Sequence, residues 1–250
     1  GEPILWRAVA EDENGTLMLS DKVLAQMAFD AAGTSGSNMV DIDSQRYGSN
    51  LWADSTIRTW LNSEATAGNV DWGGDPPTAD KIAGNIGYDT WSGFLAPDHF
   101  TATELKTIKS VEQKQIIAEF DYYDDTEYKT LGTEYHNYEE TVGNSAQNYD
   151  TAYGYNATDR VFLPDVKQID QVYENLGNYY MGRPLKSVSD NDYLTYFLRT
   201  PDMRWSCDLR VVSADGTVYA HARAHHTAHG IRPAFYIDTT SATMRSSSKG

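Results

Sequence analysis

Residues 209–237 have the sequence LRVVSADGTVYAHARAHHTAHGIRPAFYI, and this stretch decides the fold. Short groups of apolar residues occur on both sides of Asp215-Gly216, a pair typical of two-residue hairpin turns. The pattern therefore predicts strands at 209–213 and 217–219 joined at that turn, and a third strand at 231–237. Strands this closely spaced indicate a small mixed or antiparallel sheet.

Upstream segments add more strands and several short helices. Asn14-Gly15 lies between two apolar runs and predicts an opening hairpin. Asp54 and Ser55 can cap a helix near 55–63, and Thr101 and Asp165 can cap two more. The other predicted strands are 4–9, 16–19, 111–120, 160–164 and 196–199. Local helices enclosed by early and late strands indicate the α+β class.

The length of 250 residues fits one large domain, which we place at 1–240. The Gly- and Pro-rich segment 67–93 predicts loops, because it cannot hold a long regular element. The acidic, tyrosine-rich segment 121–156 predicts a solvated surface excursion and lacks the spacing of an EF-hand calcium site. We expect residues 241–250, which are small and polar, to be a disordered tail.

The charge, the hydropathy and the cysteine content argue against several classes of partner and of site. The chain has 36 acidic and 20 basic residues, a formal charge of −16, which repels nucleic acid and anionic membrane surfaces. No apolar run approaches the ~20 residues of a membrane span, so we expect no membrane insertion. The single cysteine, Cys207, allows no disulfide within the chain and no CxxC metal or redox pair.

The candidate binding residues lie close to the deciding stretch. From Tyr219 to His225, large polar or aromatic residues alternate with alanine, so an extended segment places Tyr219, His221, Arg223 and His225 on one face. A second polar patch, residues 203–208, precedes the hairpin. The turn at Asp215-Gly216 could bring this patch beside the histidine-rich segment, which gives a surface rich in the residue types of binding hot spots.

A metal site and a catalytic site are alternative hypotheses. His221 and His225 could ligate a metal, but residues four apart on a strand are ~13 Å apart, so we predict no metal site. Cys207 with a nearby histidine could act as a nucleophile, although no hydrolase, phosphate-loop or zinc-protease motif occurs. A pair of glycosidase-like carboxylates is not excluded by sequence alone. A structural surface-layer module is a further alternative.

Several motifs resemble one widespread family of bacterial surface and phage domains. They are Pro3-Ile4-Leu5-Trp6-Arg7, Leu17-Met18-Leu19-Ser20-Asp21, Trp52-Ala53-Asp54-Ser55-Thr56-Ile57-Arg58-Thr59-Trp60-Leu61-Asn62, Asp159-Arg160-Val161-Phe162-Leu163, Phe197-Leu198-Arg199-Thr200-Pro201 and Gly230-Ile231-Arg232-Pro233-Ala234. The chain is similar to the formylglycine-generating-enzyme branch of the C-type-lectin fold, which includes the variable proteins of diversity-generating retroelements. The resemblance implies that fold, with 67–93 and 121–156 as long loop insertions.

The resemblance also implies a function without catalysis. It implies a ligand-binding display protein whose hypervariable segment, about 203–229, recognises a protein or another macromolecule at a cell surface or on a virion. The implied variable, ligand-binding positions are Met203, Arg204, Trp205, Ser206, Cys207, Asp208, Tyr219, His221, Arg223, His225, His226, Thr227 and His229. Because the enzyme that names the branch uses a cysteine pair and this chain has only Cys207, its activity is not implied, and we expect no cofactor.

Overall fold

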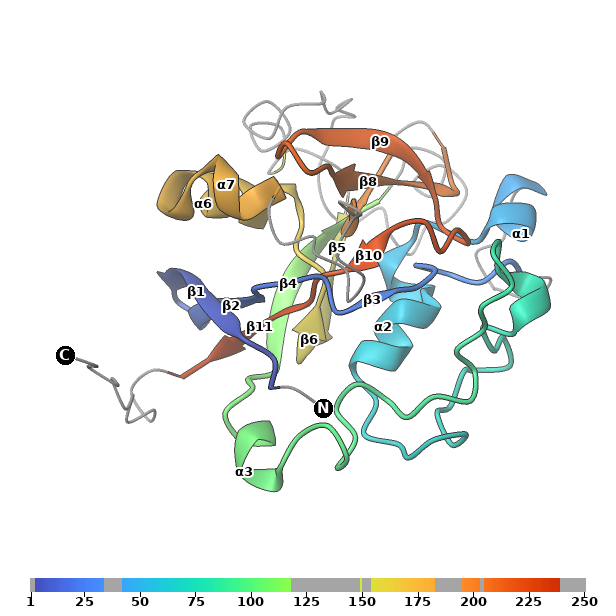
Figure 1. The fold of residues 1–250 in the computed structure, drawn as a ribbon, viewed down its shortest axis with the longest axis horizontal. Helices are drawn as coiled ribbons and strands as arrows, with labels where there is room; N and C mark the ends of the chain where they lie inside the picture. Colours follow the sequence, from blue (N-terminus) through green and yellow to red (C-terminus); the bar gives the residue numbers. More distant parts are fainter. Residues whose placement is uncertain are drawn as a thin grey trace.

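A computed structural model describes residues 3–33, 42–117, 149, 154–182, 195–202 and 205–238. The protein belongs to the α+β class, with short helices around mostly antiparallel sheets (Figure 1). Its strands are β1 (Trp6–Asp12), β2 (Gly15–Ser20), β3 (Ala25–Gln26), β4 (Val111–Ile116), β5 (Gly154–Asp159), β6 (Val161–Phe162), β7 (Tyr196–Pro201), β8 (Asp208–Val212), β9 (Val218–Arg223), β10 (Gly230–Ile231) and β11 (Ala234–Ile237). Its helices are α1 (Ile42–Tyr47), α2 (Thr56–Leu61), α3 (Ala102–Leu105), α6 (Val166–Leu176) and α7 (Asn178–Gly182), with 3₁₀ turns at Trp52–Asp54 and Ala79–Lys81.

The first sheet joins the two ends of the described chain. Its order is β1-β2-β11-β6, and all of its pairings are antiparallel. The predicted opening hairpin is confirmed, with Gly15 at the turn in a positive-φ conformation of 118°. A Cβ on Gly15 would lie 2.3 Å from the carbonyl oxygen of Ile237, so the close approach of β11 also requires glycine here.

The second sheet has the order β3-β10-β7-β8-β9 and is mixed, because β10 runs parallel to β7. The predicted hairpin of β8 and β9 around Asp215-Gly216 is confirmed. The predicted single strand 231–237 is wrong: it divides into β10 and β11, which belong to different sheets. Arg232 and Pro233 separate them, and proline has no N–H to donate to a continuous ladder.

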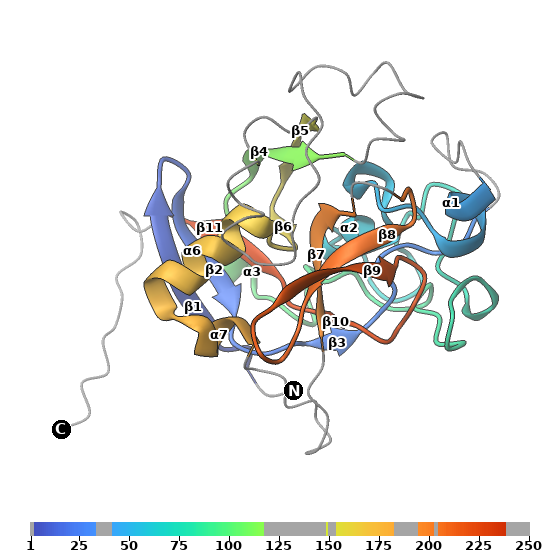
Figure 2. The same cartoon turned by 90° about the horizontal axis from the view of Figure 1, so that it is seen from above.

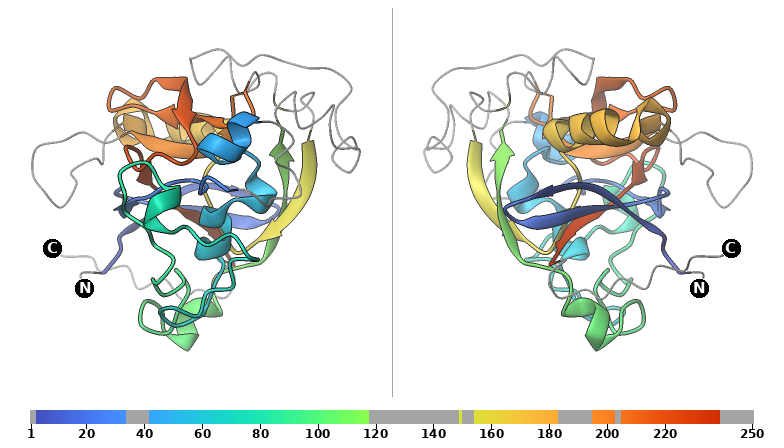
Figure 3. Two further views of the ribbon diagram at one scale, coloured as in Figure 1. Left: turned by 90° about the vertical axis from the view of Figure 1, so that its right-hand side faces the viewer. Right: turned by 90° about the vertical axis from the view of Figure 1, so that its left-hand side faces the viewer.

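The sequence predicted a single small sheet, whereas the described strands form three sheets. The third contains β4 and β5, which pair over their full lengths and form a separate layer on one flank (Figures 2 and 3).

The helix predictions are confirmed by their caps. Ser55 accepts a hydrogen bond from the Arg58 amide, and Thr101 and Asp165 each form a capping box.

The segments predicted as insertions are more integrated than expected. Segment 67–93 consists of loops and one 3₁₀ turn, as predicted, but its Ile82 and Tyr88 belong to the buried core. Residues 154–156, the last part of the second predicted insertion, lie in β5 and pair with β4. Most of 121–156 lies outside the described residues, as do residues 241–250.

Aromatic side chains, several tryptophans among them, pack in and against the core. Trp52 is fully buried, with Phe29 at 5.9 Å between ring centroids, and its indole N–H donates to Asp159. Trp60 is 5% exposed, and Trp6 packs on Phe235 with 4.4 Å between centroids. The longest described helix, α6, has 11 residues, and none of the described helices has the length and apolarity to cross a membrane.

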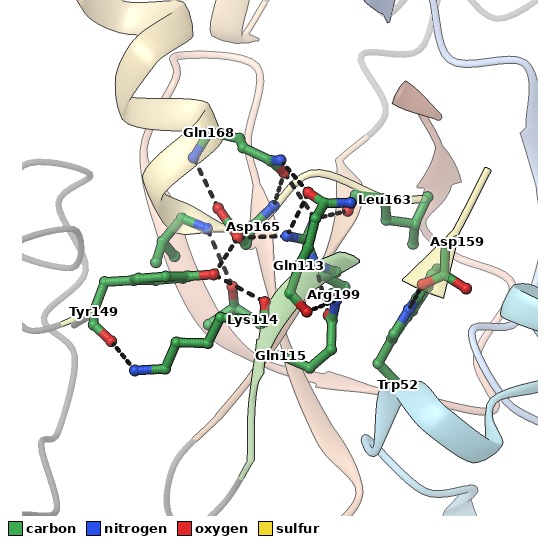
Figure 4. Close-up of polar contacts among 12 residues, drawn as sticks. Trp52, Gln113, Lys114, Gln115, Tyr149, Asp159, Leu163, Asp165, Gln168 and Arg199 are labelled. Carbon is green, nitrogen blue, oxygen red and sulfur yellow. Dashed lines mark hydrogen bonds and ion pairs between the residues drawn. The ribbon is translucent and has the colours of Figure 1, made fainter. Parts of the chain in front are cut away.

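A buried arginine links three elements beside this core. Arg199 of β7 donates to Gln115 of β4 (2.7 Å), to Asp165 before α6 (2.5 Å) and to Gln168 within α6 (2.7 Å) (Figure 4). The carbonyl oxygen of Leu163 accepts a further bond of 2.6 Å. Because every nitrogen of the guanidinium has an acceptor, Arg199 acts as a structural cross-link.

Candidate functional site

The two polar segments predicted to meet are adjacent in the structure. Asp208 of β8 pairs with Arg223 of β9, and the amide of Ala224 donates to the carbonyl oxygen of Cys207 at 2.9 Å. The prediction was that the hairpin brings the patch 203–208 beside the histidine-rich segment, and this pairing confirms it for the described residues 205–208. Met203 and Arg204 lie outside the described residues.

A buried asparagine holds the first of these segments in place. The side-chain amide of Asn50 donates to the carbonyl oxygens of Trp205 (2.5 Å) and Asp208 (2.8 Å). Its backbone amide donates to the carbonyl oxygen of Ser206 at 2.9 Å. Since Asn50 is only 1% exposed, these bonds are shielded from water and fix the path of the backbone below Trp205.

Helix α1 supplies an aromatic ring that the sequence analysis did not single out. The guanidinium of Arg223 lies 3.7 Å from the centroid of the Tyr47 ring, and the His225 ring lies 5.3 Å from it. The amide of His225 donates to the carbonyl oxygen of Tyr47 at 2.8 Å, and the His226 ring follows at 4.7 Å from His225. This arrangement stacks an exposed cation on an aromatic face beside two imidazoles.

A loop from segment 67–93 forms the other border. The amide of Ala83 donates to the carbonyl oxygen of His225 at 3.0 Å, and Thr227 Oγ1 donates to the carbonyl oxygen of Ala83 at 3.1 Å. Gly84 has a φ of 108°, and a Cβ there would lie 2.4 Å from Thr227 Oγ1. The contact therefore requires glycine at position 84. The sequence alone does not indicate that this glycine lies against residue 227.

Together these four segments, 42–47, 82–86, 205–208 and 223–227, form what we call the candidate face. Its exposed apolar side chains come from three different segments: Trp205 is 46% exposed, Ile42 61% and Ile86 55%. In Figures 1 and 2, α1 and the start of the turn after β9 lie together at one side of the molecule. The arrangement can present apolar anchors and a cation to a partner.

Not every predicted ligand-binding residue lies on the exposed part of this face. Ser206, Cys207 and Asp208 are buried, with exposed fractions of 4%, 4% and 9%. Burial, followed by the neighbouring carboxylate of Asp208, raises the pKa of the Cys207 thiol to about 12. The thiol therefore stays protonated at neutral pH, and this environment opposes its use as a nucleophile.

The predicted alternation from Tyr219 to His225 does not persist along β9. Tyr219 pairs with Val211 and Ala222 pairs with Leu209, so β9 contains one extra residue between them. This bulge puts Tyr219 on the same side as Ala222, where it packs half-buried against the core instead of beside Arg223. His225 lies beyond the strand, in a turn, and the side chain of His221 is outside the described part of the chain.

A family model described as "Domain of unknown function (DUF6273)" matches residues 13–239. The chain belongs to this family. Comparisons with curated proteins and with solved structures found no match. The DUF6273 match spans all four segments of the candidate face and both segments predicted as insertions.

Two histidines of this DUF6273 domain, His225 and His229, resist protonation. Burial lowers the pKa of His225 to about 4, assisted by His226 and Arg223. Burial, with a smaller contribution from His226, also lowers the pKa of His229 to about 4, and the His229 ring packs on Phe197 at 4.9 Å. These two imidazoles are neutral between pH 5 and 8, so a pH response in that range does not originate from them.

A buried carboxyl group, that of Asp30, lies directly below the candidate face. Asp30 is 5% exposed and accepts hydrogen bonds from the amides of Ser49 and Thr56, both at 2.9 Å. The amides of Phe29 and Asp30 in turn donate to the carbonyl oxygen of Ala224, at 2.8 and 3.1 Å. Burial raises the pKa of Asp30 to about 7 despite the two backbone donors.

In the described residues no group of three or more His, Cys, Asp or Glu could hold a metal ion.

Proposed function

We propose that this chain is a ligand-binding display module whose candidate face recognises a protein or another macromolecule, with the C-type-lectin fold and the variable surface of retroelement-diversified proteins. The proposal assigns no catalytic role and no cofactor. It assigns display at a cell surface or on a virion.

One observation carries the proposal: the backbone of the candidate face is held by hydrogen bonds to neighbouring segments, while several of its side chains are exposed. Main-chain bonds connect residues 206 and 224–227 to segments 29–30, 47–50 and 82–84. Trp205 and Arg223 point outward from this frame and are both exposed. Because the clamping bonds use backbone atoms, the exposed side chains can change without loss of those bonds, as a diversified surface requires.

The sheet arrangement supports the lectin-type fold. The N-terminal hairpin and the C-terminal strand share one sheet, while the strands that carry the candidate face belong to another. The split between β10 and β11 connects the two sheets immediately after the histidine-rich segment. In the proposed fold, this segment is the variable region that precedes the closing strand.

The chemistry of the exposed residues favours a macromolecular partner. Tryptophan and arginine are the residue types most enriched at protein-binding hot spots, and here they come from adjacent segments. The formal charge of −16 opposes a nucleic acid. A partner with an apolar depression for Trp205 and an acidic group opposite Arg223 has the complementary character.

The decisive experiment is to sequence this locus across a source population, and to search beside it for a template repeat and a reverse transcriptase gene. We expect substitutions at positions of the candidate face such as the exposed 205 and 223 and the half-buried 226, at adenine-bearing template codons. Asn50, Asp30 and Gly84 are the matched internal controls, because their roles depend on fixed side chains or on the lack of one, and they should be invariant. An invariant segment 203–229 without the genetic apparatus would overturn the proposal.

A further inference from the structure

An exposed tryptophan, Trp91, is held rigidly in the loops between α2 and α3 (Figure 1). Its ring packs on Trp60 at 6.4 Å and on Tyr88 at 6.1 Å between centroids, and both neighbours are buried. The ring planes differ by 67° and 56°, so neither neighbour lies flat on the Trp91 ring and covers a whole face. Since Trp91 is 38% exposed, a ligand can reach this anchored ring.

Three polar side chains follow this ring in the chain and contact one another. Ser92 Oγ lies 3.1 Å from Asp98 Oδ2 and 3.4 Å from His99 Nε2, and those two atoms are 3.7 Å apart. The side chains of Asp98 and His99 are 62% and 39% exposed, so a ligand in solution can reach both. We call Ser92, Asp98 and His99 the polar trio, and the trio together with Trp91 the Trp91 site.

The ring and the polar trio lie over the same buried residue. The indole N–H of Trp60 donates to the carbonyl oxygen of Ser92 at 2.9 Å, and the Trp91 ring packs on the same indole. Because Trp60 is only 5% exposed and lies beneath both, the accessible parts of Trp91 and Ser92 face away from it. A ligand that packs on Trp91 can therefore also contact the polar trio.

The polar trio has more acceptors than protons to share. His99 Nδ1 lies 3.2 Å from the carbonyl oxygens of both Gly93 and Phe94, so in the neutral ring it carries the proton and Nε2 is an acceptor. The Ser92 hydroxyl has one proton, which can serve Asp98 or His99 Nε2 but not both at once. One accessible acceptor is therefore open to a donor from a ligand.

The chemistry of the Trp91 site favours an uncharged ligand. The carboxylate of Asp98 repels a carboxylate or a phosphate group. A cation gains little from Asp98, because water screens the attraction between such exposed charges. Packing on the Trp91 ring must then supply much of the affinity, which requires a flat apolar surface with hydrogen-bond donors at its edge.

We propose that the Trp91 site binds one face of the pyranose ring of a neutral sugar. The C–H groups on that face carry a slight positive charge and pack against the electron-rich face of an indole. A hydroxyl both donates and accepts, so hydroxyls at the edge of the sugar can donate to Asp98 or His99 and accept from Ser92. This site is independent of the proposed function, because none of its residues belongs to the candidate face.

The test is ligand-observed NMR titration of the full chain with the methyl glycosides of glucose, galactose and N-acetylglucosamine. Inorganic phosphate and lysine amide are the anionic and cationic comparison probes. Trp91→Ala removes the ring, Trp91→Phe keeps an aromatic face, and Asp98→Ala removes one acceptor of the polar trio. The matched control is Trp205→Ala, which removes a tryptophan of similar exposure, 46%, from the candidate face. Thermal unfolding of every variant checks that the fold is intact.

We expect at least one glycoside to bind, with saturation transferred most strongly to the C–H protons of one face of its ring. Trp91→Ala should weaken that binding roughly tenfold and Asp98→Ala roughly three- to fivefold, whereas Trp91→Phe should retain most of it. Trp205→Ala should leave it unchanged.

The proposal is overturned if none of the glycosides binds, whether or not phosphate or lysine amide does. It is also overturned if folded Trp91→Ala binds sugar as the wild type does, or if Trp205→Ala weakens the binding as much as Trp91→Ala. Because Trp205 belongs to the candidate face and Trp91 does not, failure here is distinguishable from failure of the proposed function.

Discussion

Arg199 and Arg223 lie in the same five-stranded sheet, and their surroundings are opposite. Arg199 is in β7 near the middle of the sheet, is 2% exposed and has acceptors for all of its guanidinium nitrogens. Arg223 is at the end of the edge strand β9, is exposed and stacks on Tyr47. The guanidinium nitrogens of Arg199 all donate to groups of the fold itself, whereas Arg223 keeps its hydrogen-bond donors available to a partner.

The same contrast holds for the regions around them. The central region uses side chains as cross-links, so each side chain there is constrained by several others. The candidate face uses backbone bonds for support and leaves several side chains exposed. We therefore expect substitutions in the central region to change stability, and substitutions on the candidate face to change binding.

The largest effect should follow Arg199→Met. The change leaves Asp165 and its neighbouring acceptors buried without their cation, so we expect the free energy of unfolding to fall by ~3–5 kcal/mol. Urea denaturation followed by circular dichroism measures this loss. A decrease below ~1 kcal/mol would contradict the role of Arg199 as the cross-link between β4, β7 and α6.

The next effect concerns Asp30, which supports the candidate face from below. Its pKa in the folded state is about 7, above the ordinary value of 3.8, so the native state binds more protons between these pH values. Its contribution to stability is therefore fully present below pH 4 and is lost as the pH rises to 7, at a total cost of roughly 2–4 kcal/mol.

Asp30→Asn should remove that pH dependence, because the amide stays neutral and retains one acceptor oxygen. The measurement is the difference in unfolding free energy between wild type and variant at pH values from 4 to 8. A difference that is constant across this range would show that Asp30 is ionised at all of them.

Smaller effects are expected at the exposed residues of the candidate face. Trp205→Ala and Arg223→Ala should each lower the free energy of unfolding by less than ~1 kcal/mol, since Arg223 loses one exposed cation–π contact and Trp205 is half-exposed. The matched control is Leu209→Ala in β8, fully buried, which should cost ~2–5 kcal/mol. Equal losses for the exposed and buried positions would remove the distinction between the two regions.

The smallest effect should be the pH response of the histidines. The pKa values of His225 and His229 are about 4, so both imidazoles should titrate near pH 4 and stay unchanged between pH 5 and 8. NMR chemical shifts of the imidazole protons across pH 3–8 test this directly. A midpoint near 6.5 for His225 would mean that its ring is more solvated than its packing against Tyr47 implies.

Local signals predicted much of the fold. Caps at Ser55, Thr101 and Asp165, the turns at Asn14-Gly15 and Asp215-Gly216, and the runs of apolar residues identified most of the described helices and strands. These features depend on neighbours a few residues away. The sequence offered no such signal for the division of 231–237 between two sheets, because that depends on where two distant strands supply partners.

The candidate site was predictable only in part for the same reason. The hairpin turn was enough to bring 205–208 beside 223–227. The contributions of Tyr47, Asn50 and Gly84 depend on contacts with residues 140 or more positions away, and the bulge in β9 that turns Tyr219 inward depends on its pairing with β8. The prediction that alternate residues share one face assumes an unbroken ladder. A single extra residue in the strand moves the residues after it to the opposite face.

The pairing of β2 with β11 sets an order of events during protein synthesis. Residues Thr16–Leu19 cannot complete their sheet until Ala234–Ile237 have left the ribosome. Segment 205–227 is therefore made before this sheet can close, and contacts between such distant residues form slowly. A variant of the candidate face thus meets chaperones and proteases before it is fully folded, so cellular quality control acts on such a variant before any binding does.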